Sequence, residues 1–406
     1  MLRPVSLSFY CLLSELPPAF SATHGETKKM NIECGKKIAL LLIIVAVLFA
    51  GTGVAMCADS GAPLEYAQYL RIEEWSGCKL ATILSPRDRE KVAYRFLLVP
   101  RGTPVPKNYP KARVFRVPVE RVVSFSTTHL AYIDTAGKTG DLVGLSGFNY
   151  VNTPSVRRLI ESGKLEEVGQ MNSLKLETVL DLSPDLILTP DMDSAHTVHS
   201  RLLAAGLPAV PIMDHVEEHP LGRCEWIKLL ALFLGTESHA DTLFNEIAGR
   251  YHALVLKAAS VRNRPRVIAG APFQGQWYVA RGNSFVAQFI RDAGGDYIWS
   301  HIPGTDSVLM DAEAAYEAVL EADIWLNPGE WKRLEDGLSA DPRFAVIPAM
   351  KPGKVFNYNK RLNRWGGNDY WESGMLRPDE VLADLIAILH PEILPDRELM
   401  YYRKLE

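Results

Sequence analysis

The sequence predicts an α/β protein with two Rossmann-like lobes, each built on a central and mostly parallel sheet, joined by one long helix and preceded by a small N-terminal β extension. Two observations support this fold class. Short apolar strands alternate with helices on both sides of residues 236–261, and residues 236–261 carry apolar side chains at steps of three and four. Nothing interrupts that pattern for about 25 residues, or roughly 38 Å of helix. Thr236 could cap this helix. Periodicity alone leaves open whether it is a strut between two halves or a packing helix in one larger domain.

The composition is that of an ordinary folded protein. The chain has 406 residues, enough for two or three domains, with 23% charged residues and a formal net charge of −4. Because no long basic run is present, we expect no nucleic-acid partner.

The residues before position 59 have the order of an export signal. Two lysines precede the apolar run Ile38–Ala50, and small residues follow it. Since Met30 would start such a segment with a short charged region, we expect residues 30–58 to be the signal peptide. Residues 1–29 would then be a non-native extension from a misplaced start codon. The alternative is a transmembrane anchor, for which the apolar run is short.

The cysteines bear on where the mature chain resides. Cys57 stands where a bacterial lipoprotein carries its lipid, although Met56 before it is larger than the usual residue. We therefore expect a location in the periplasm or on the outer face of the cytoplasmic membrane, and leave open whether Cys57 is lipidated or removed. Cys78 and Cys224 remain beyond it, and their pairing also stays open.

The chain divides into four parts after the signal peptide. Residues 59–117 are expected to form a β hairpin, from residues 80–84 and 94–99, and a proline-rich extended connector. The N-terminal lobe is expected at 118–235, the linking helix at 236–261 and the C-terminal lobe at 262–406. Strands are predicted at 121–126, 142–145, 185–189, 209–213, 266–271, 277–279, 323–327 and 354–358, with helices between them, including one from 221 to 234 and a last one that begins at Pro378.

From about Pro118 to Glu406 the chain resembles the bacterial substrate-binding proteins of iron–siderophore, haem and cobalamin ABC importers. The run Leu176-Glu-Thr-Val-Leu-Asp-Leu-Ser-Pro-Asp-Leu-Ile-Leu is moderately specific for them. Further matching blocks are Trp277-Tyr-Val-Ala-Arg-Gly-Asn-Ser-Phe, residues 341–355 and residues 377–385. Residues 59–117 lie outside the resemblance, and their role stays open.

The resemblance implies two α/β lobes joined by one long helix, which favours the strut. It implies a receptor that delivers a metal chelate to an ABC permease. The export signal and the lack of a nucleophile elbow, a phosphate-binding glycine loop or a His-Glu-x-x-His motif agree with this, so we expect an exported monomer that is not an enzyme and has no cofactor. An iron–siderophore is the first expectation. A haem or cobalamin receptor is the alternative, although Met171 and Pro190 stand where cobalamin receptors carry tryptophans. A chelatase-like, metal-handling enzyme on a two-lobed fold is the alternative from a different class.

Ligands of open α/β sheets lie beyond the carboxyl ends of the strands, and aromatic faces hold flat chelates. Arg361 and Arg364 could pair with an anionic chelate, or belong to a solvated loop. Trp277 could equally be a core residue. The ligand-binding residues that we expect are Phe148, Asn149, Tyr150, Met171, Asp191, Gln274, Trp277, Trp331, Arg361, Arg364, Trp365, Tyr370 and Trp371.

Two further groups of residues carry expectations. The resemblance implies that Glu177 and Glu313 dock the lobes onto permease arginines; ordinary surface carboxylates are the alternative. His196, His199 and His215 follow predicted strand ends and are candidate metal ligands, with surface histidines as the competing interpretation.

Overall fold

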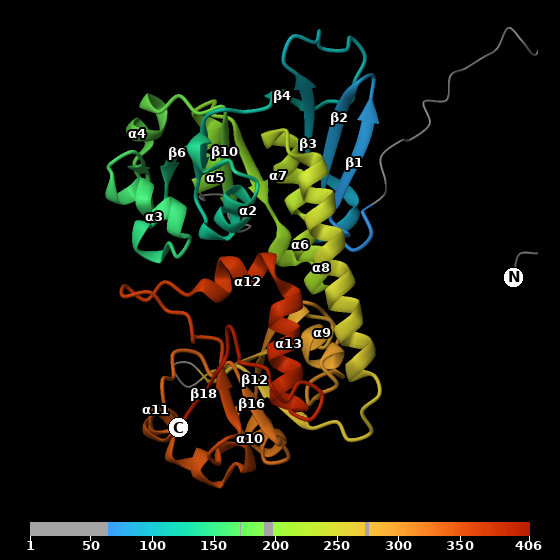
Figure 1. Ribbon diagram of the computed structural model, residues 1–406, viewed down its shortest axis with the longest axis vertical. Coiled ribbons are helices and arrows are strands. Elements are labelled where there is room, and N and C mark those ends of the chain that lie inside the picture. The colour runs from blue at the N-terminus through green and yellow to red at the C-terminus, as the bar shows by residue number, and fades with distance from the viewer. Residues whose placement is uncertain (1–63, 171, 191–197, 273–275) are drawn as a thin grey trace, which may run out of the picture. The chain divides into compact units, whose positions relative to one another are not determined.

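The computed structural model describes residues 64–170, 172–190, 198–272 and 276–406. It confirms the predicted fold class: two five-stranded, mostly parallel sheets flanked by helices, one long linking helix and a separate four-stranded sheet near the N-terminus (Figure 1). Among these residues no helix combines the length and apolar character needed to cross a membrane. The apolar run at 38–50 lies outside the described residues.

The N-terminal lobe, hereafter the N-lobe, is built on a fully parallel sheet. In spatial order its strands are β11 (Ala209–Ile212), β10 (Leu186–Pro190), β5 (Val122–Ser124), β6 (Leu142–Leu145) and β7 (Glu166–Glu167). Strands β6 and β7 are added on one side of β5, and β10 and β11 on its other side. The place where the strand order changes side, between β5 and β10, is a switch point of the kind where open α/β sheets bind ligands. Its helices are α2 (Leu130–Thr135), α3 (Pro154–Glu161), α4 (Leu176–Asp181), α5 (Val198–Ala204), α6 (Pro220–Glu225) and α7 (Ile227–Leu234), and a short pair, β8 (Gly169–Gln170) and β9 (Ser173–Leu174), lies apart from the sheet.

Both faces of this sheet are covered, as the continuous apolar strands require. In β10, Ile187 packs in a cluster with Val179 of α4 and Leu202 of α5, whereas Leu186 and Leu188 point into the main core. The helix predicted over 221–234 is divided at Trp226 into α6 and α7.

The C-terminal lobe, hereafter the C-lobe, repeats this plan with one reversed strand. In spatial order its strands are β14 (Asp296–Tyr297), β12 (Arg266–Ala269), β16 (Ile324–Leu326), β17 (Val355–Asn357) and the antiparallel β18 (Arg403–Lys404). The other elements are the antiparallel pair β13 (Trp277–Ala280) and β15 (Ser307–Met310), and the helices α9 (Phe285–Asp292), α10 (Ala312–Val319), α11 (Leu334–Ala340), α12 (Ser373–Leu376) and α13 (Pro378–Leu389).

One aspartate has the same task in each lobe. The Asp185 carboxylate, just before β10, accepts the backbone N–H of Arg121 beside β5 at 3.2 Å. The Asp323 carboxylate, just before β16, accepts the backbone N–H of Arg266 in β12 at 2.8 Å. These two sequence-equivalent positions therefore fasten neighbouring strands in both sheets.

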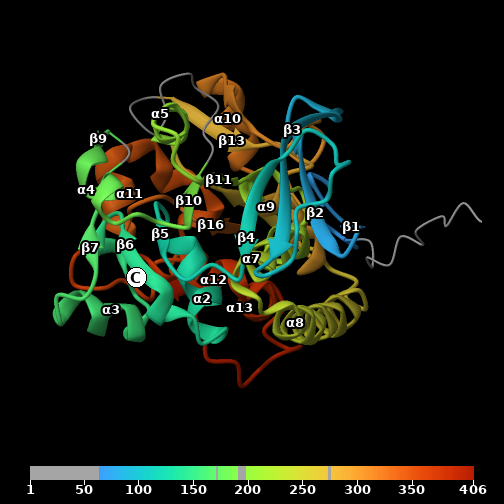
Figure 2. The same ribbon diagram turned by 90° about the horizontal axis from the view of Figure 1, so that it is seen from above.

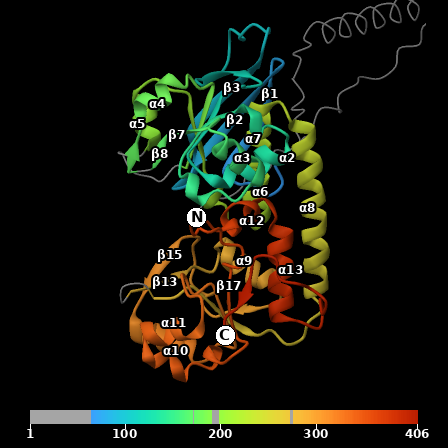
Figure 3. The same ribbon diagram turned by 60° about the vertical axis from the view of Figure 1, so that its left-hand side comes forward.

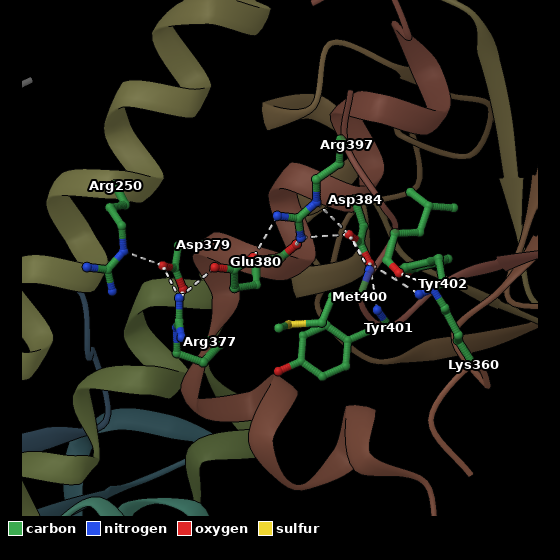
Figure 4. Close-up of polar contacts among 11 residues, drawn as sticks. Arg250, Lys360, Arg377, Asp379, Glu380, Asp384, Arg397, Met400, Tyr401 and Tyr402 are labelled. Carbon is green, nitrogen blue, oxygen red and sulfur yellow. Dashed lines mark hydrogen bonds and ion pairs between the residues drawn. The ribbon is translucent and has the colours of Figure 1, made fainter. Parts of the chain in front are cut away.

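The linking helix is α8 (Glu237–Ala258), 22 residues long, which packs against α7 of the N-lobe and α13 of the C-lobe (Figure 3). The expected cap is wrong in detail: the Thr236 side chain makes no capping hydrogen bond and its hydroxyl instead lies 2.9 Å from the Tyr132 hydroxyl. Toward the C-lobe, Arg250 of α8 pairs with the buried Asp379 at the start of α13, with Nε 2.6 Å from Oδ2 (Figure 4).

The C-terminal segment is fixed by one buried carboxylate on α13. Asp384 is fully buried and accepts the backbone N–H groups of Met400, Tyr401 and Tyr402 at 2.7–3.1 Å (Figure 4). The Arg397 guanidinium lies 2.8 Å from the same carboxylate. These contacts place β18 beside β17 and so complete the C-lobe sheet.

The N-terminal extension is a sheet of β1 (Leu70–Trp75), β2 (Cys78–Ser85), β3 (Asp88–Pro100) and β4 (Arg113–Val117). The predicted hairpin is confirmed as β2 and β3, but the connector is only partly extended loop, because its last residues form β4 parallel to β3. One face of this sheet packs on α7 (Figure 2). The Phe115 and Phe233 rings meet there edge to face, with centroids 5.1 Å apart.

The two cysteines left open by the sequence do not pair. Cys78 and Cys224 are both buried free thiols. Cys224 donates from Sγ to the Leu376 carbonyl at 3.4 Å, and burial raises the pKa of both thiols.

Candidate functional site

A cleft of about 680 Å³ lies between the two lobes, beyond the carboxyl ends of their strands. From the N-lobe, Thr127 follows β5 and Tyr150 follows β6. From the C-lobe, Gly329, Glu330 and Lys332 follow β16, while Tyr358 and Asn359 follow β17. Its remaining lining comes from residues 361–372, hereafter the strap, through Leu362, Gly366, Asn368 and Trp371.

Three aromatic side chains line this cleft. Tyr150 and Trp371 are 54% and 39% exposed, far more than a core aromatic residue. Tyr358 stacks on the buried Tyr370 with ring centroids 4.6 Å apart, and Trp371 meets Tyr358 edge to face at 5.5 Å. Burial raises the pKa of the Tyr358 and Tyr370 hydroxyls, so both remain neutral at physiological pH. Open aromatic faces from both lobes are suited to a flat or macrocyclic ligand.

The charges in the described lining balance. Glu330 is its acidic side chain and Lys332 its basic one, and both are exposed. The remaining polar groups of that lining are neutral hydroxyls and amides. Such a lining does not favour a ligand of high net charge, because a buried charge requires a partner of opposite sign.

The two predicted arginines of the strap are already engaged within it. Arg361 Nε lies 2.6 Å from Oδ2 of the buried Asp369. The Arg364 guanidinium lies over the Trp365 ring, 3.9 Å from its centroid, and Arg157 of α3 lies over the same ring at 4.1 Å. These arginines therefore shape the strap, and they are not among the residues that line the described cleft.

The two predicted tryptophans of the C-lobe sheet belong to its core. Trp277 is 2% exposed and stacks on Trp325 at 6.1 Å, and Trp331 is 9% exposed and packs on Trp325 at 5.1 Å. Neither ring is among the residues that line the described cleft, so the burial of both favours a core role over ligand contact.

The other predicted positions divide between the cleft and its surroundings. Tyr150 and Trp371 line the cleft, and Tyr370 stacks on Tyr358 of the lining. Phe148 packs against the core, and Asn149 contributes a backbone carbonyl to a contact with the strap. Trp365 lies in the strap, 39% exposed. Met171, Asp191, Gln274 and His196 lie outside the described residues.

The remaining histidines do not form a metal site among the residues described. His199 is buried, and its Nδ1 lies 2.8 Å from the Thr189 hydroxyl. His215 lies in a short turn of helix at Asp214–Val216. No group of three potential metal ligands is found in the described part of the chain.

Glu177 and Glu313 occupy equivalent positions in the two lobes. Glu177 lies in the first turn of α4 and Glu313 in the first turn of α10, and both side chains are exposed. The electropositive ends of the helices favour these carboxylates without a partner.

Sequence reasoning missed several residues that build the site. Tyr358 was predicted only as part of a strand. Asn363 and Glu372 belong to no recognised motif, although both side chains form hydrogen bonds with the N-lobe. A usable signal was the run Asn359–Glu372 after a strand end, in which aromatic, amide and charged residues alternate.

Comparison with known proteins agrees with this architecture. Residues 122–362 match the sequence model of the periplasmic binding protein family, and the chain therefore belongs to that family. Two uncharacterized lipoproteins of Methanocaldococcus jannaschii are 27% and 25% identical to it, over 84% and 78% of this chain and 85% and 81% of their own lengths.

Two solved structures show the same fold. One is a possible iron-binding, periplasmic solute-binding protein of Staphylococcus epidermidis, with a TM-score of 0.53, 18% identity, and 67% of this chain and 99% of that chain covered. The other is a periplasmic heme-binding protein of Pseudomonas aeruginosa, with a TM-score of 0.52, 18% identity, and 71% and 98% covered. The resemblance to two-lobed binding proteins drawn from the sequence is thus confirmed, and the extension β1–β4 precedes the family match.

Proposed function

We propose that this protein captures a metal chelate of low net charge, an iron–siderophore in the first instance, and delivers it to an ABC transporter permease. The observation that carries the proposal is the interlobe cleft of about 680 Å³ with Tyr150, Tyr358 and Trp371 on its walls. Its volume is in the range of sites that enclose a small organic ligand. The balanced charges of Glu330 and Lys332 favour a hydroxamate-type ferric chelate over a highly anionic catecholate.

Titration of the purified protein tests this function through intrinsic fluorescence. Ferrioxamine B, haemin, cyanocobalamin and free Zn²⁺ would be added separately, and we expect ferrioxamine B to quench through Trp371. Trp371→Phe should remove most of that signal, whereas Trp75→Phe in the extension should leave it. Binding of Zn²⁺ with no response to the three chelates would refute the proposal, and a response to haemin or cyanocobalamin alone would assign the alternative receptor class.

We also propose that Glu177 and Glu313 dock onto the permease. Their support is exposure and equivalent placement at the first turns of α4 and α10. Reversal of charge in Glu177→Lys should abolish chelate uptake by cells while binding by the purified protein is unchanged. Glu90→Lys, an exposed reversal on β3, is the matched control and should transport normally. Loss of binding in Glu177→Lys would contradict the docking role.

The proposed location is outside the cytoplasmic membrane, with Cys57 as a lipid attachment point. Support comes from the family and from the two relatives named as lipoproteins. Metabolic labelling with a fatty-acid analogue should mark the parent protein and not Cys57→Ala. Equal labelling of both would exclude Cys57.

A further inference from the structure

The strap reaches from the C-lobe to the N-lobe, and its first contact is made by one asparagine. Asn363 Nδ2 donates to the carbonyl of Asn149 at 2.9 Å and to that of Val151 at 3.1 Å. Its Oδ1 accepts the backbone N–H groups of Trp365 and Gly367, each at 2.9 Å. Because carbonyl oxygens only accept, the orientation of this amide is determined, and all its contacts are used either to fold the strap or to hold the N-lobe.

The second contact is a buried carboxylate at the end of the strap. Glu372 is fully buried and accepts the backbone N–H groups of Asn152 and Thr153, both at 2.7 Å, and the Thr153 hydroxyl. These donors lie at the N-terminus of α3, which begins at Pro154 and favours a carboxylate. Burial raises the pKa of Glu372, and the hydrogen bonds from Thr153 and Asn152 oppose that rise, so this contact stabilises the carboxylate there.

Tyr150 lies between these two contacts. Its chain neighbours on both sides are held by Asn363, and the next two residues by Glu372. Gly367 approaches its backbone so closely that a Cβ atom there would stand 2.5 Å from the Tyr150 carbonyl oxygen. This cleft wall has its own 3-10 turn at Phe148–Tyr150, and the opposite lobe holds that turn in place from both sides.

The strap also carries a reporter of this contact. Trp365 lies within 4.1 Å of the Arg157 guanidinium on α3, and Arg157 itself donates to the Phe148 carbonyl at 2.7 Å. Release of the strap would separate this ring from its N-lobe cation and change its emission.

We propose that Glu372 and Asn363 form an interlobe latch that positions Tyr150 as a wall of the ligand site, so that the latch must open before a bound chelate leaves. This inference rests on the proposed function of the cleft. Both are positioning residues, since they act on the ligand through the backbone around Tyr150. It follows that the latch controls the dissociation rate of the chelate more than its association rate.

Two independent variants test the latch in the full-length protein. Glu372→Gln keeps the shape but leaves at least one of three donors without an acceptor, and Gly367→Ala pushes the strap from Tyr150 without touching Glu372. With whichever of ferrioxamine B, haemin or cyanocobalamin binds the parent, each variant should raise the dissociation rate about tenfold. Gly140→Ala, where a Cβ meets nothing within 4 Å, is the matched control and should match the parent.

A ligand-free measurement separates this inference from the proposed function. The emission assigned to Trp365, taken as the difference between each protein and its Trp365→Phe derivative, should change in Glu372→Gln and not in Gly140→Ala. Dissociation rates within twofold of the parent in both latch variants would overturn the latch and leave the proposed function standing. Failure of the parent to bind any of the three chelates would overturn the proposed function, and with it the role of the latch in ligand release.

Discussion

The arm before β1 and the strap are both attached to the N-lobe by buried glutamates that accept backbone N–H groups, but the residues around these contacts differ. The extension arm before β1 is held by two buried glutamates. Glu225 accepts the N–H groups of residues 65–67 at 2.8–3.0 Å, and Glu217 accepts those of residues 68 and 69 at 2.8 and 3.0 Å. The strap is held by Glu372 in the same manner, through the N–H groups of residues 152 and 153. In each case a carboxylate on one segment satisfies backbone donors on another.

The residues around each contact determine how easily it can open. The extension adds an aromatic core, in which Phe96, Phe115 and Phe233 pack together. The strap is bordered by the cleft, and its contacts around Tyr150 are with backbone groups and polar side chains. Apolar burial is lost entirely when such a core is pulled apart, whereas water can replace exchanged hydrogen bonds. We therefore expect the extension to stay attached to the N-lobe, and the contact through Asn363 and Glu372 to be the one that can open.

The largest effect should come from the aromatic core of the extension. Phe233→Ala removes a fully buried ring and should lower the free energy of unfolding by about 4 kcal/mol. Denaturant unfolding would measure it, with Leu256→Ala, 74% exposed on α8, as the control. A loss below about 1 kcal/mol would break the comparison, because the extension would then depend on its polar contacts alone.

The second-largest loss of stability should come from Glu225, which holds the extension arm. Glu225→Gln leaves the Lys228 ammonium, now 2.7 Å from Oε1, without its charged partner and weakens three hydrogen bonds to this buried side chain. We expect a loss of about 3 kcal/mol in unfolding free energy. Glu90→Gln, at an exposed position of β3, is the control. An unchanged midpoint in urea would show that the arm is not held by this carboxylate.

A fall in pH should lower the stability of the protein through His129 of the N-lobe. This histidine lines a small cavity together with Met375 and Leu376 of α12, the helix that follows the strap. Burial lowers the pKa of His129 from 6.5 to about 4, and Asp214, itself 3.7 Å from Arg223, opposes this only partly. Between these values the unfolded chain binds a proton that the folded protein excludes, so stability falls as the pH falls.

The loss attributable to His129 should be about 2 kcal/mol at pH 5 relative to pH 7.5. His129→Gln should flatten the dependence of the melting temperature on pH in this window, and His239→Gln, at an exposed position, should not. Identical pH profiles for the parent and His129→Gln would show that this histidine does not couple acid to the lobe contact.

The smallest effect should be at the margin of the strap. Arg157→Met removes the cation over Trp365 and the hydrogen bond to the Phe148 carbonyl, and should cost about 1 kcal/mol. The expected signature is a change in Trp365 emission with little change in unfolding. A loss comparable to that of Phe233→Ala would make the strap as permanent as the extension.

Local periodicity predicted the elements that are regular and buried. The apolar run 185–189 forms β10 and the amphipathic run 236–261 contains α8, because each pattern can be buried in only one way. β4 was missed because three prolines precede it, and the division of residues 221–234 at Trp226 has no sequence signal that we recognise.

The candidate site was predictable as a place but not as a set of contacts. Strand ends and aromatic content indicated Tyr150 and Trp371, yet the same content indicated Trp277, which is buried in the core. The sequence pattern of a strand does not distinguish a tryptophan whose ring faces the core from one whose ring faces a cleft. Arg361 and Arg364 were candidates for pairing with an anionic chelate, yet they contact Asp369 and Trp365, which lie eight positions and one position further along the chain.

The sequence by itself determined the two α/β lobes, the linking helix and the family, because these depend on patterns that repeat within tens of residues. Only the tertiary structure decided which side chains meet across the cleft. Glu372 and Thr153 are 219 positions apart, and nothing in the residues around Glu372 indicates that its carboxylate is buried. A buried carboxylate is stable only where donors converge on it, and that convergence arises when the two lobes are brought together.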